Sequence, residues 1–233
     1  MATGTSGPTT EPIGRRRGAD DGFVVAAVLF DLDGTLIDST PAVTRCWRGW
    51  CDEFGIAPSI LADSHGRRAV EIIGEVLPAA DVAEAVRRLD ELELADLDGV
   101  TALPGAATAL AALGAGQGAI VTSAVRTLAL ARLAAAGLVP PTTVVTADDV
   151  RVGKPNPEPY LTAARLLGVD PADCLVVEDA AAGVASARAA GMRVLGVLTN
   201  PHVAGLDADL VVRGLDEVSW RSQDGSVAVR AGR

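Results

Sequence analysis

Cysteine is scarce in this chain, whose 233 residues include only Cys46, Cys51 and Cys174. An odd number of cysteines at scattered positions does not suit a disulfide framework, and their spacing is not that of a metal-binding motif. Cysteines of this kind are typically reduced and packed in the protein core. We therefore expect a cytoplasmic protein with free cysteines.

Positive charge is also in short supply, since the formal net charge is -10 at pH 7. This balance disfavours nucleic acid and anionic membrane surfaces as partners, and we expect neither. No apolar stretch approaches membrane-spanning length, and the amino terminus lacks the apolar segment of a signal peptide. We expect a monomer or weak dimer, in which any anionic substrate is held by local cations.

Nucleotide-binding loops are missing as well. The sequence contains no G-x-x-x-x-G-K-[ST] motif, and the glycine-rich segment 114–118 precedes an apolar run instead of following one. There are also no internal repeats. These absences exclude the common nucleotide-binding enzymes and the repeat architectures.

The most informative segment that is present is Asp31-Leu32-Asp33-Gly34-Thr35, directly after the apolar run 24–30. The run predicts a buried strand of a parallel sheet, and such sheets bind ligands at the carboxyl ends of their strands. Alternation places Asp31 and Asp33 on the same side, where burial of both carboxylates requires a cation or a shared proton. The segment favours a metal-dependent active site, although an Asx turn with Gly34 ending the strand would also explain it.

Three later apolar runs end in polar residues too. Residues 119–121 lead to Ser123, residues 143–145 lead towards Lys154, and residues 175–177 lead to the pair Glu178 and Asp179. In chain order these segments supply a hydroxyl, an ammonium and an acidic pair. Strand and helix patterns alternate throughout this half, which predicts an α/β fold with a parallel sheet covered on both faces.

Composition and periodicity divide the chain into segments. Residues 1–22 are rich in Gly, Thr, Pro and charge and predict a disordered tail, and residues 221–233 are polar and predict a flexible one. Residues 39–101 show only helical periodicity, with apolar stripes that we interpret as packing. Residues 23–38 and 102–220 would form the α/β core.

These four motifs, in this order, resemble those of the haloacid dehalogenase superfamily of phosphohydrolases over residues 24–212. The resemblance implies a Rossmann-like three-layer α/β/α core with a parallel sheet. It also implies that the helical insert 39–101 is a small cap, placed after the first strand. The activity implied is hydrolysis of a phosphate monoester.

The resemblance assigns roles to individual residues. Asp31 would be the nucleophile that forms an aspartyl phosphate, and Asp33 the acid that protonates the leaving oxygen and then the base that activates water. Mg²⁺ would be held by Asp31, the backbone carbonyl of Asp33, Asp179 directly and Glu178 through water. In the substrate site, the Ser123 hydroxyl and the Ala124 backbone N–H would bind a phosphoryl oxygen, and Lys154 would neutralise its charge.

Substrate choice is expected to lie in the cap. The segment 64–68 brings His65, Gly66, Arg67 and Arg68 into one loop, and it resembles the branch of sugar and glycerol phosphatases. We predict that His65, Gly66 and Arg67 contact a small phosphorylated sugar or polyol, although solvated arginines at a helix start would give the same pattern.

Four other functions would fit parts of the pattern. A sugar phosphomutase shares every core motif, and a phosphoglycolate phosphatase differs only in substrate. A noncatalytic phosphate-binding protein would keep the residues without turnover. A haloacid dehalogenase would need neither Asp33 nor a cation, so Asp33 and the pair Glu178 and Asp179 count against it.

Overall fold

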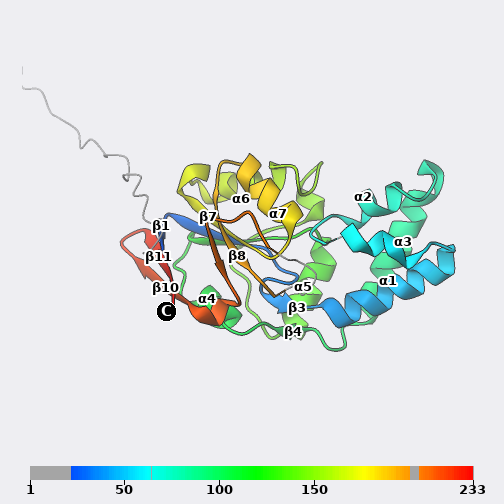
Figure 1. The fold of residues 1–233 in the computed structure, drawn as a ribbon, viewed down its shortest axis with the longest axis horizontal. Coiled ribbons are helices and arrows are strands. Elements are labelled where there is room, and N and C mark those ends of the chain that lie inside the picture. Colours follow the sequence, from blue (N-terminus) through cyan, green and yellow to red (C-terminus); the bar gives the residue numbers. More distant parts are fainter. Residues whose placement is uncertain (1–21, 64, 200–204, 233) are drawn as a thin grey trace, which may run out of the picture.

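The computed structural model describes residues 22–63, 65–199 and 205–232. The predicted disordered tail, residues 1–22, lies outside the described residues except for Gly22. A six-stranded parallel sheet forms the centre, in the order β6-β5-β2-β7-β8-β9 (Figure 1). Its strands are β2 (Ala27–Phe30), β5 (Gly118–Val121), β6 (Thr143–Val145), β7 (Cys174–Glu178), β8 (Arg193–Val197) and β9 (Leu210–Val212).

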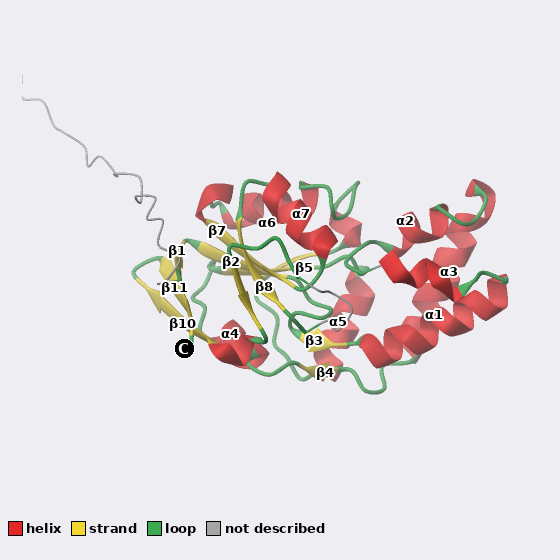
Figure 2. Cartoon of the chain, in the orientation of Figure 1, coloured by secondary structure: helices red, strands yellow, loops and turns green. Residues whose placement is uncertain are grey.

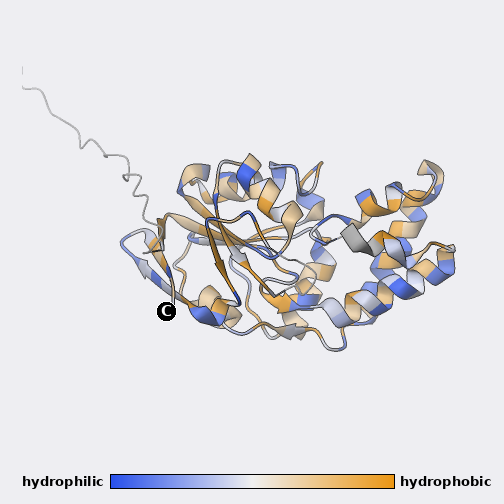
Figure 3. Ribbon diagram, in the orientation of Figure 1, coloured by the Kyte–Doolittle hydropathy of each residue, from blue (hydrophilic) through white to orange (hydrophobic). Residues whose placement is uncertain are grey.

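Helices cover both faces of this sheet, as predicted for a three-layer α/β/α core (Figure 2). The helices are α4 (Ala106–Ala111), α5 (Arg126–Ala135), α6 (Glu158–Leu167) and α7 (Ala181–Ala189), with 3₁₀ turns η2 (Ala147–Asp149), η3 (Pro171–Asp173) and η4 (Leu215–Glu217). Along β2, Ala27 and Leu29 pack with α6 and α7, whereas Val28 and Phe30 pack with α4 and α5. Because both faces are buried, β2 and β5 are apolar throughout, and β7 is apolar up to its last residue, Glu178 (Figure 3).

The apolar run 24–30 forms two strands, not the single strand that we predicted. It bends at Ala26, and β1 (Phe23–Val25) leaves the central sheet to pair antiparallel with β11. Only β2 belongs to the parallel sheet. Periodicity cannot detect this break, because both halves are apolar and the strand that pairs with β1 lies more than 200 residues further along the chain.

The prediction of a flexible tail at residues 221–233 is wrong for the described residues up to 232. Strands β10 (Val218–Gln223) and β11 (Ser226–Ala231) form a hairpin whose turn is Asp224-Gly225, and with β1 they make a three-stranded sheet. Asp-Gly between alternating strands is a strong hairpin signal. The inward side chains, including Trp220, pack on the core, and the Trp220 ring lies 5.5 Å from that of Phe30.

In its described residues the insert contains three α-helices and one 3₁₀ helix, and it lies at the far end of the molecule from this hairpin (Figure 1). They are α1 (Thr40–Phe54), η1 (Pro58–Asp63), α2 (Ala69–Gly74) and α3 (Ala79–Ala95). Their apolar stripes meet in a separate hydrophobic cluster around Trp47, Trp50 and Leu89. The stripes are therefore packing surfaces, as interpreted from the sequence.

The chain enters and leaves the insert side by side. Strands β3 (Ile37–Asp38) and β4 (Thr101–Ala102) pair as a short antiparallel ribbon at this point.

The three cysteines are free and buried, as expected. Within the described residues, no helix has the length and apolar character needed to cross a membrane.

Candidate active site

Three buried carboxylates meet at the carboxyl edge of the central sheet. Asp31 follows β2 and Glu178 ends β7, and these neighbouring parallel strands pair Phe30 with Val177. Asp31, Glu178 and Asp179 can each offer an oxygen such that all three oxygens lie within 4.8 Å of one another. The sheet register therefore brings together the first and last of the predicted motifs.

One ammonium group serves this cluster. Lys154 Nζ donates to Asp31 Oδ1 at 2.6 Å, to Glu178 Oε1 at 2.7 Å and to the carbonyl of Val121 at 3.0 Å. The side chain is 1% exposed. Burial alone would lower the pKa of Lys154, but Asp31 and Glu178 outweigh it and raise that pKa, so the lysine stays charged.

Glu178 is fixed from every side. Its Oε1 accepts from Lys154 and, at 2.8 Å, from the Tyr160 hydroxyl, while Oε2 accepts from the backbone N–H groups of Asp179 and Ala180. With both oxygens engaged, Glu178 has little capacity for a further direct ligand. This arrangement agrees with a role through water, whereas Asp179 is the better candidate for direct contact with a cation.

Two glycines make room for the acidic side chains. Gly34 has a φ of 92°, and a Cβ there would overlap the Asp179 carboxylate. A Cβ at Gly183, inside α7, would overlap the carboxylate of Glu178. Any larger residue at either position must displace a carboxylate of the site.

Gly183→Ala is therefore expected to lower both thermal stability and activity, although alanine is the better helix former by about 1 kcal/mol. The added methyl group would push Glu178 off Lys154 and Tyr160. Gly49→Ala in α1 is the matched control, because nothing lies within 4 Å of a Cβ there. It should raise the free energy of unfolding by roughly 0.5–1 kcal/mol. Thermal melts of both variants test the pair, and an unaffected Gly183→Ala protein would contradict the placement of Glu178.

The charge of the cluster is not balanced by the protein alone. Burial raises the pKa of Asp31 to about 7, with Lys154 acting in the opposite direction, and burial, Asp31 and Glu178 raise the pKa of Asp179 well above its usual range. Three carboxylates share one ammonium, so their ionised forms repel one another. An all-oxygen donor set of this kind fits a hard divalent cation such as Mg²⁺.

Stability of the metal-free protein is expected to fall as the pH rises from about 4 to about 7. Burial also raises the pKa of Glu93 to about 7. Carboxyls whose native pKa lies above the unfolded value bind protons more tightly in the native state, so deprotonation of Asp31 and Glu93 over this range favours unfolding. Urea midpoints in excess chelator across this range measure the effect. Asp31→Asn should flatten the slope, and a stability that rises with pH would contradict these shifts.

Asp33 is not one of the three clustered carboxylates, although its charge contributes to the raised pKa of Asp31. Its Oδ1 accepts from the Ser39 hydroxyl at 2.7 Å and from Arg132 Nη1 at 3.0 Å. The strand ends before Asp31, so strict alternation no longer applies at Asp33. These bonds tie the carboxylate to the start of α1 and to the helix α5.

The predicted phosphate ligands Ser123 and Ala124 lie after β5, beside the cap loop. The Ser123 hydroxyl donates to the Gly66 carbonyl at 2.7 Å, and the Ala124 N–H donates to the Thr122 hydroxyl at 3.1 Å. Gly66 is also packed against α7, since a Cβ there would lie 3.0 Å from the Ala180 side chain. The structure thus brings Gly66 to the core motifs, with the cap loop closed over them.

The two arginines of the cap loop have different partners. Arg67 is ion-paired with Glu75 inside the cap. Arg68 donates to the carbonyls of Val150 and Arg151 and pairs with Glu71, which accepts from the Gly153 N–H next to Lys154. His65 is described, whereas Ser64 lies outside the described residues. The structure therefore docks Arg68 on the loop that carries the lysine.

The family model described as haloacid dehalogenase-like hydrolase matches residues 25–191 of this chain. This chain belongs to that family. The match contains all four strand-end motifs and the whole helical insert, in agreement with the resemblance seen in the sequence.

Curated relatives of this haloacid dehalogenase-like hydrolase act on small phosphate esters, as their names state. Hexitol phosphatase A of Escherichia coli K12 is 43% identical over 210 residues, covering 87% of this chain and 97% of the relative. Glycerol-1-phosphate phosphohydrolase 2 of Saccharomyces cerevisiae is 35% identical over 206 residues, covering 83% and 79%. A hydrolase from Pseudomonas syringae has a similar structure, with a TM-score of 0.73 at 25% identity, covering 82% of this chain and 94% of that one.

Sequence reasoning about this hydrolase missed three contributors to the site. Tyr160 lies six residues after Lys154 in the same motif, and that spacing was its only signal in the sequence. Arg132 reaches Asp33 from α5 and Glu93 holds Arg132 from α3, and nothing local in their helices distinguishes them from surface charges. Only the packing of the two helices reveals their burial.

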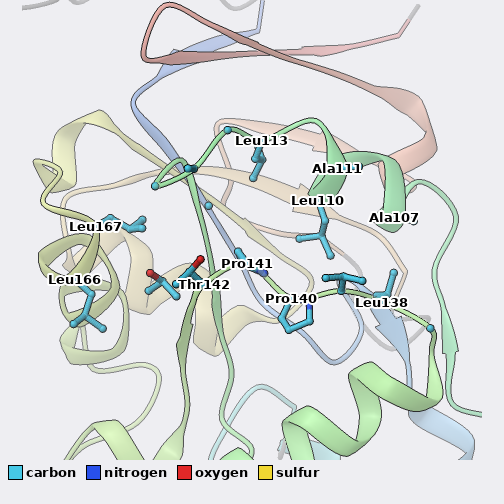
Figure 4. Close-up of a pocket in the computed structure, with 17 residues that line it drawn as sticks. Ala107, Leu110, Ala111, Leu113, Leu138, Pro140, Pro141, Thr142, Leu166 and Leu167 are labelled. Carbon is cyan, nitrogen blue, oxygen red and sulfur yellow. The ribbon is translucent and has the colours of Figure 1, made fainter.

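A hollow among the described residues of the hydrolase lies away from this site. It has a volume of about 620 Å³ and is lined by α4, the loop before β5 and the loop before β6 (Figure 4). Leu110, Leu138 and Pro140 are among its lining residues. Because β5 and β6 start there, this hollow lies at the amino edge of the sheet, opposite to the carboxylates, and takes no part in the site.

Proposed function

We propose that the protein is a Mg²⁺-dependent phosphatase that hydrolyses a small sugar or polyol phosphate monoester through an aspartyl-phosphate intermediate. The observation that carries the proposal is the buried cluster of Asp31, Glu178 and Asp179 around Lys154. Polyol and sugar phosphatases among the relatives, including hexitol phosphatase A at 43% identity, support the substrate class.

In the proposed reaction Asp31 is the nucleophile. Lys154 holds Asp31 Oδ1, which leaves Oδ2 as the oxygen that attacks phosphorus. The lysine also neutralises charge on the phosphoryl group, and Tyr160 and the backbone N–H groups keep Glu178 in place. Mg²⁺ bound by Asp31, Asp179 and the Asp33 carbonyl, with Glu178 acting through water, would neutralise phosphoryl oxygens and orient the ester.

The proposed phosphate ligand Ser123 is hydrogen-bonded to the cap loop. Its hydroxyl reaches a phosphoryl oxygen only if the bond to the Gly66 carbonyl is exchanged. We propose that substrate entry opens this contact, and that Ser123 and the Ala124 N–H then bind the phosphoryl group. His65, Gly66 and Arg67 would face the sugar or polyol part as the loop closes again.

Asp33 is proposed to act as the acid and then as the base. Asp33→Asn should lower turnover of an alkyl phosphate by roughly 10² to 10⁴, because the leaving alkoxide then lacks a proton donor. The loss should be smaller with p-nitrophenyl phosphate, whose leaving group needs little protonation. Steady-state kinetics with both esters measure the difference, and Asp52→Asn on the exposed face of α1 is the control. Equal losses on both esters would argue against Asp33 as the acid.

A phosphate-release screen tests the function as a whole. Hexitol, glycerol, hexose and glycolate phosphates are compared at equal concentration with Mg²⁺. The proposal expects free phosphate, with polyol or sugar esters turned over fastest. Isomerised sugar phosphate without net phosphate release would instead indicate a mutase, and binding without either product would indicate a noncatalytic protein.

A further inference from the structure

A buried guanidinium joins the cap to the proposed acid–base group. Arg132 lies on α5 of the core, and its side chain is 6% exposed. Nη1 donates to Asp33 Oδ1 at 3.0 Å, and Nη2 donates to Glu93 Oε1 of the cap helix α3 at 3.1 Å. The Arg132 side chain therefore connects three segments that are far apart in sequence: the loop that carries Asp33, the core helix α5 and the cap helix α3.

Stability alone is a poor explanation for this arrangement. Placing a guanidinium and two carboxylates out of water is costly, and well-packed apolar residues of similar size are often as stable or more so. Moreover, Arg132 Nε is buried and has no hydrogen-bond partner among the described residues. A buried charge network that is incompletely satisfied, and that ends on the proposed acid, indicates a functional use.

The geometry of Asp33 shows what that use is. Its carboxylate is 27% exposed, so water could solvate it, yet Oδ1 is shared by two fixed donors, Ser39 and Arg132. Ser39 precedes α1 by one residue and provides the local contact. Arg132 provides the distant one, and a planar guanidinium held by Glu93 fixes both the position and the orientation of its donor.

We propose that Arg132 is a positioning residue that places the Asp33 carboxylate for proton transfer, and that Glu93 holds Arg132 in that position when the cap is docked. The inference rests on the proposed function, since it assumes that Asp33 transfers the proton. Proton transfer by Asp33 then depends on the docked cap, because Glu93 belongs to the cap helix α3 and moves with it. Arg132 itself contacts neither the leaving group nor the phosphoryl group in this assignment.

The first test compares two leaving groups. Arg132→Met keeps the length of the apolar stem and removes the donors. It should lower kcat for the best alkyl phosphate by about 10- to 100-fold, the size expected when a catalytic group is misplaced, with KM changed less than about threefold. The loss on p-nitrophenyl phosphate should be several-fold smaller. Arg132→Lys should recover part of the activity, and Glu93→Gln should show a weaker loss with the same leaving-group pattern.

A double-mutant cycle separates positioning from folding. If Arg132 acts through Asp33, adding Arg132→Met to Asp33→Asn should cause little further loss, whereas independent roles would give losses that multiply. The control is Arg88→Met, which breaks a similar arginine–glutamate pair between α3 and α1 on the cap surface and should leave the kinetics unchanged.

Each outcome decides the inference. Equal losses on both esters, multiplicative losses in the cycle or a change confined to KM would overturn it while leaving the phosphatase assignment intact. Should Arg132→Met fail to fold, Arg132→Lys and Glu93→Gln carry the same comparison. A wild-type protein that released phosphate from no ester would overturn the proposed function and this inference together.

Discussion

Asp31→Asn should abolish phosphate release, with a loss on the order of 10⁴- to 10⁶-fold, as for removal of the nucleophile in other covalent enzymes. The change keeps the shape of the side chain but removes the attacking oxygen and one of the charges around the proposed cation. The fold should survive, because Lys154 keeps its contacts with Glu178 and the Val121 carbonyl. Phosphate release and a thermal melt are measured on the same preparation.

Asp52→Asn provides the matched control for this variant. It is the same chemical change on an exposed position of α1, and it should leave both activity and melting temperature unaltered. Substantial turnover by folded Asp31→Asn protein would rule out Asp31 as the nucleophile. A loss of folding in Asp31→Asn but not in Asp52→Asn would instead assign Asp31 a structural role.

Removal of divalent cations should reduce activity to background, and Mg²⁺ should restore it. The reason is the imbalance of charge in the cluster, where Asp31, Glu178 and Asp179 share the single ammonium of Lys154. Mg²⁺ should also raise the melting temperature, because it offsets the repulsion between these buried carboxylates. Chelator titrations followed by activity and by thermal melts measure both effects.

Asp179→Asn tests the same site by changing the side chain that is proposed to bind the cation directly. This variant should need more Mg²⁺ for half-maximal activity and should show a smaller Mg²⁺-dependent rise in melting temperature. Ca²⁺ should not replace Mg²⁺, because its larger and looser coordination shell does not hold the ester in line with Asp31. Full activity in excess chelator would exclude the metal-dependent mechanism.

The cap loop contributes more to the core than its sequence suggested. Gly66 accepts the Ser123 hydrogen bond, Arg68 holds the carbonyls of Val150 and Arg151, and Glu71 accepts from the Gly153 N–H. The loops that carry Ser123 and Lys154 are therefore both in contact with the cap. Movement of the cap would therefore change the contacts of both loops.

The acidic cluster was predictable because its determinants are local. Each motif follows an apolar run, and parallel strands place their carboxyl ends at one edge of the sheet, so Asp31, Glu178, Asp179 and Lys154 converge once the sheet forms. The cap helices were predictable for a similar reason, since their apolar stripes repeat at helical spacing and meet in one cluster.

Other features depended on partners that are distant in sequence. The break at Ala26 exists because β1 pairs with β11, and the carboxyl-terminal hairpin is ordered because its apolar face, including Trp220, packs on Phe30. The Asp-Gly turn was visible in the sequence. The strand pair around it was not recognised, because one face of each strand is exposed to solvent and carries polar residues.

The sequence by itself determined the α/β class, the four strand-end motifs and the chemistry that they suit. Only the tertiary structure decided which side chains hold Asp33, that Arg132 and Glu93 are buried in one network with it, and that Arg68 holds the lysine loop. The physical reason is that strand ends and helix faces follow from local periodicity. The partner of a long charged side chain depends instead on how separate helices pack, which no local pattern encodes.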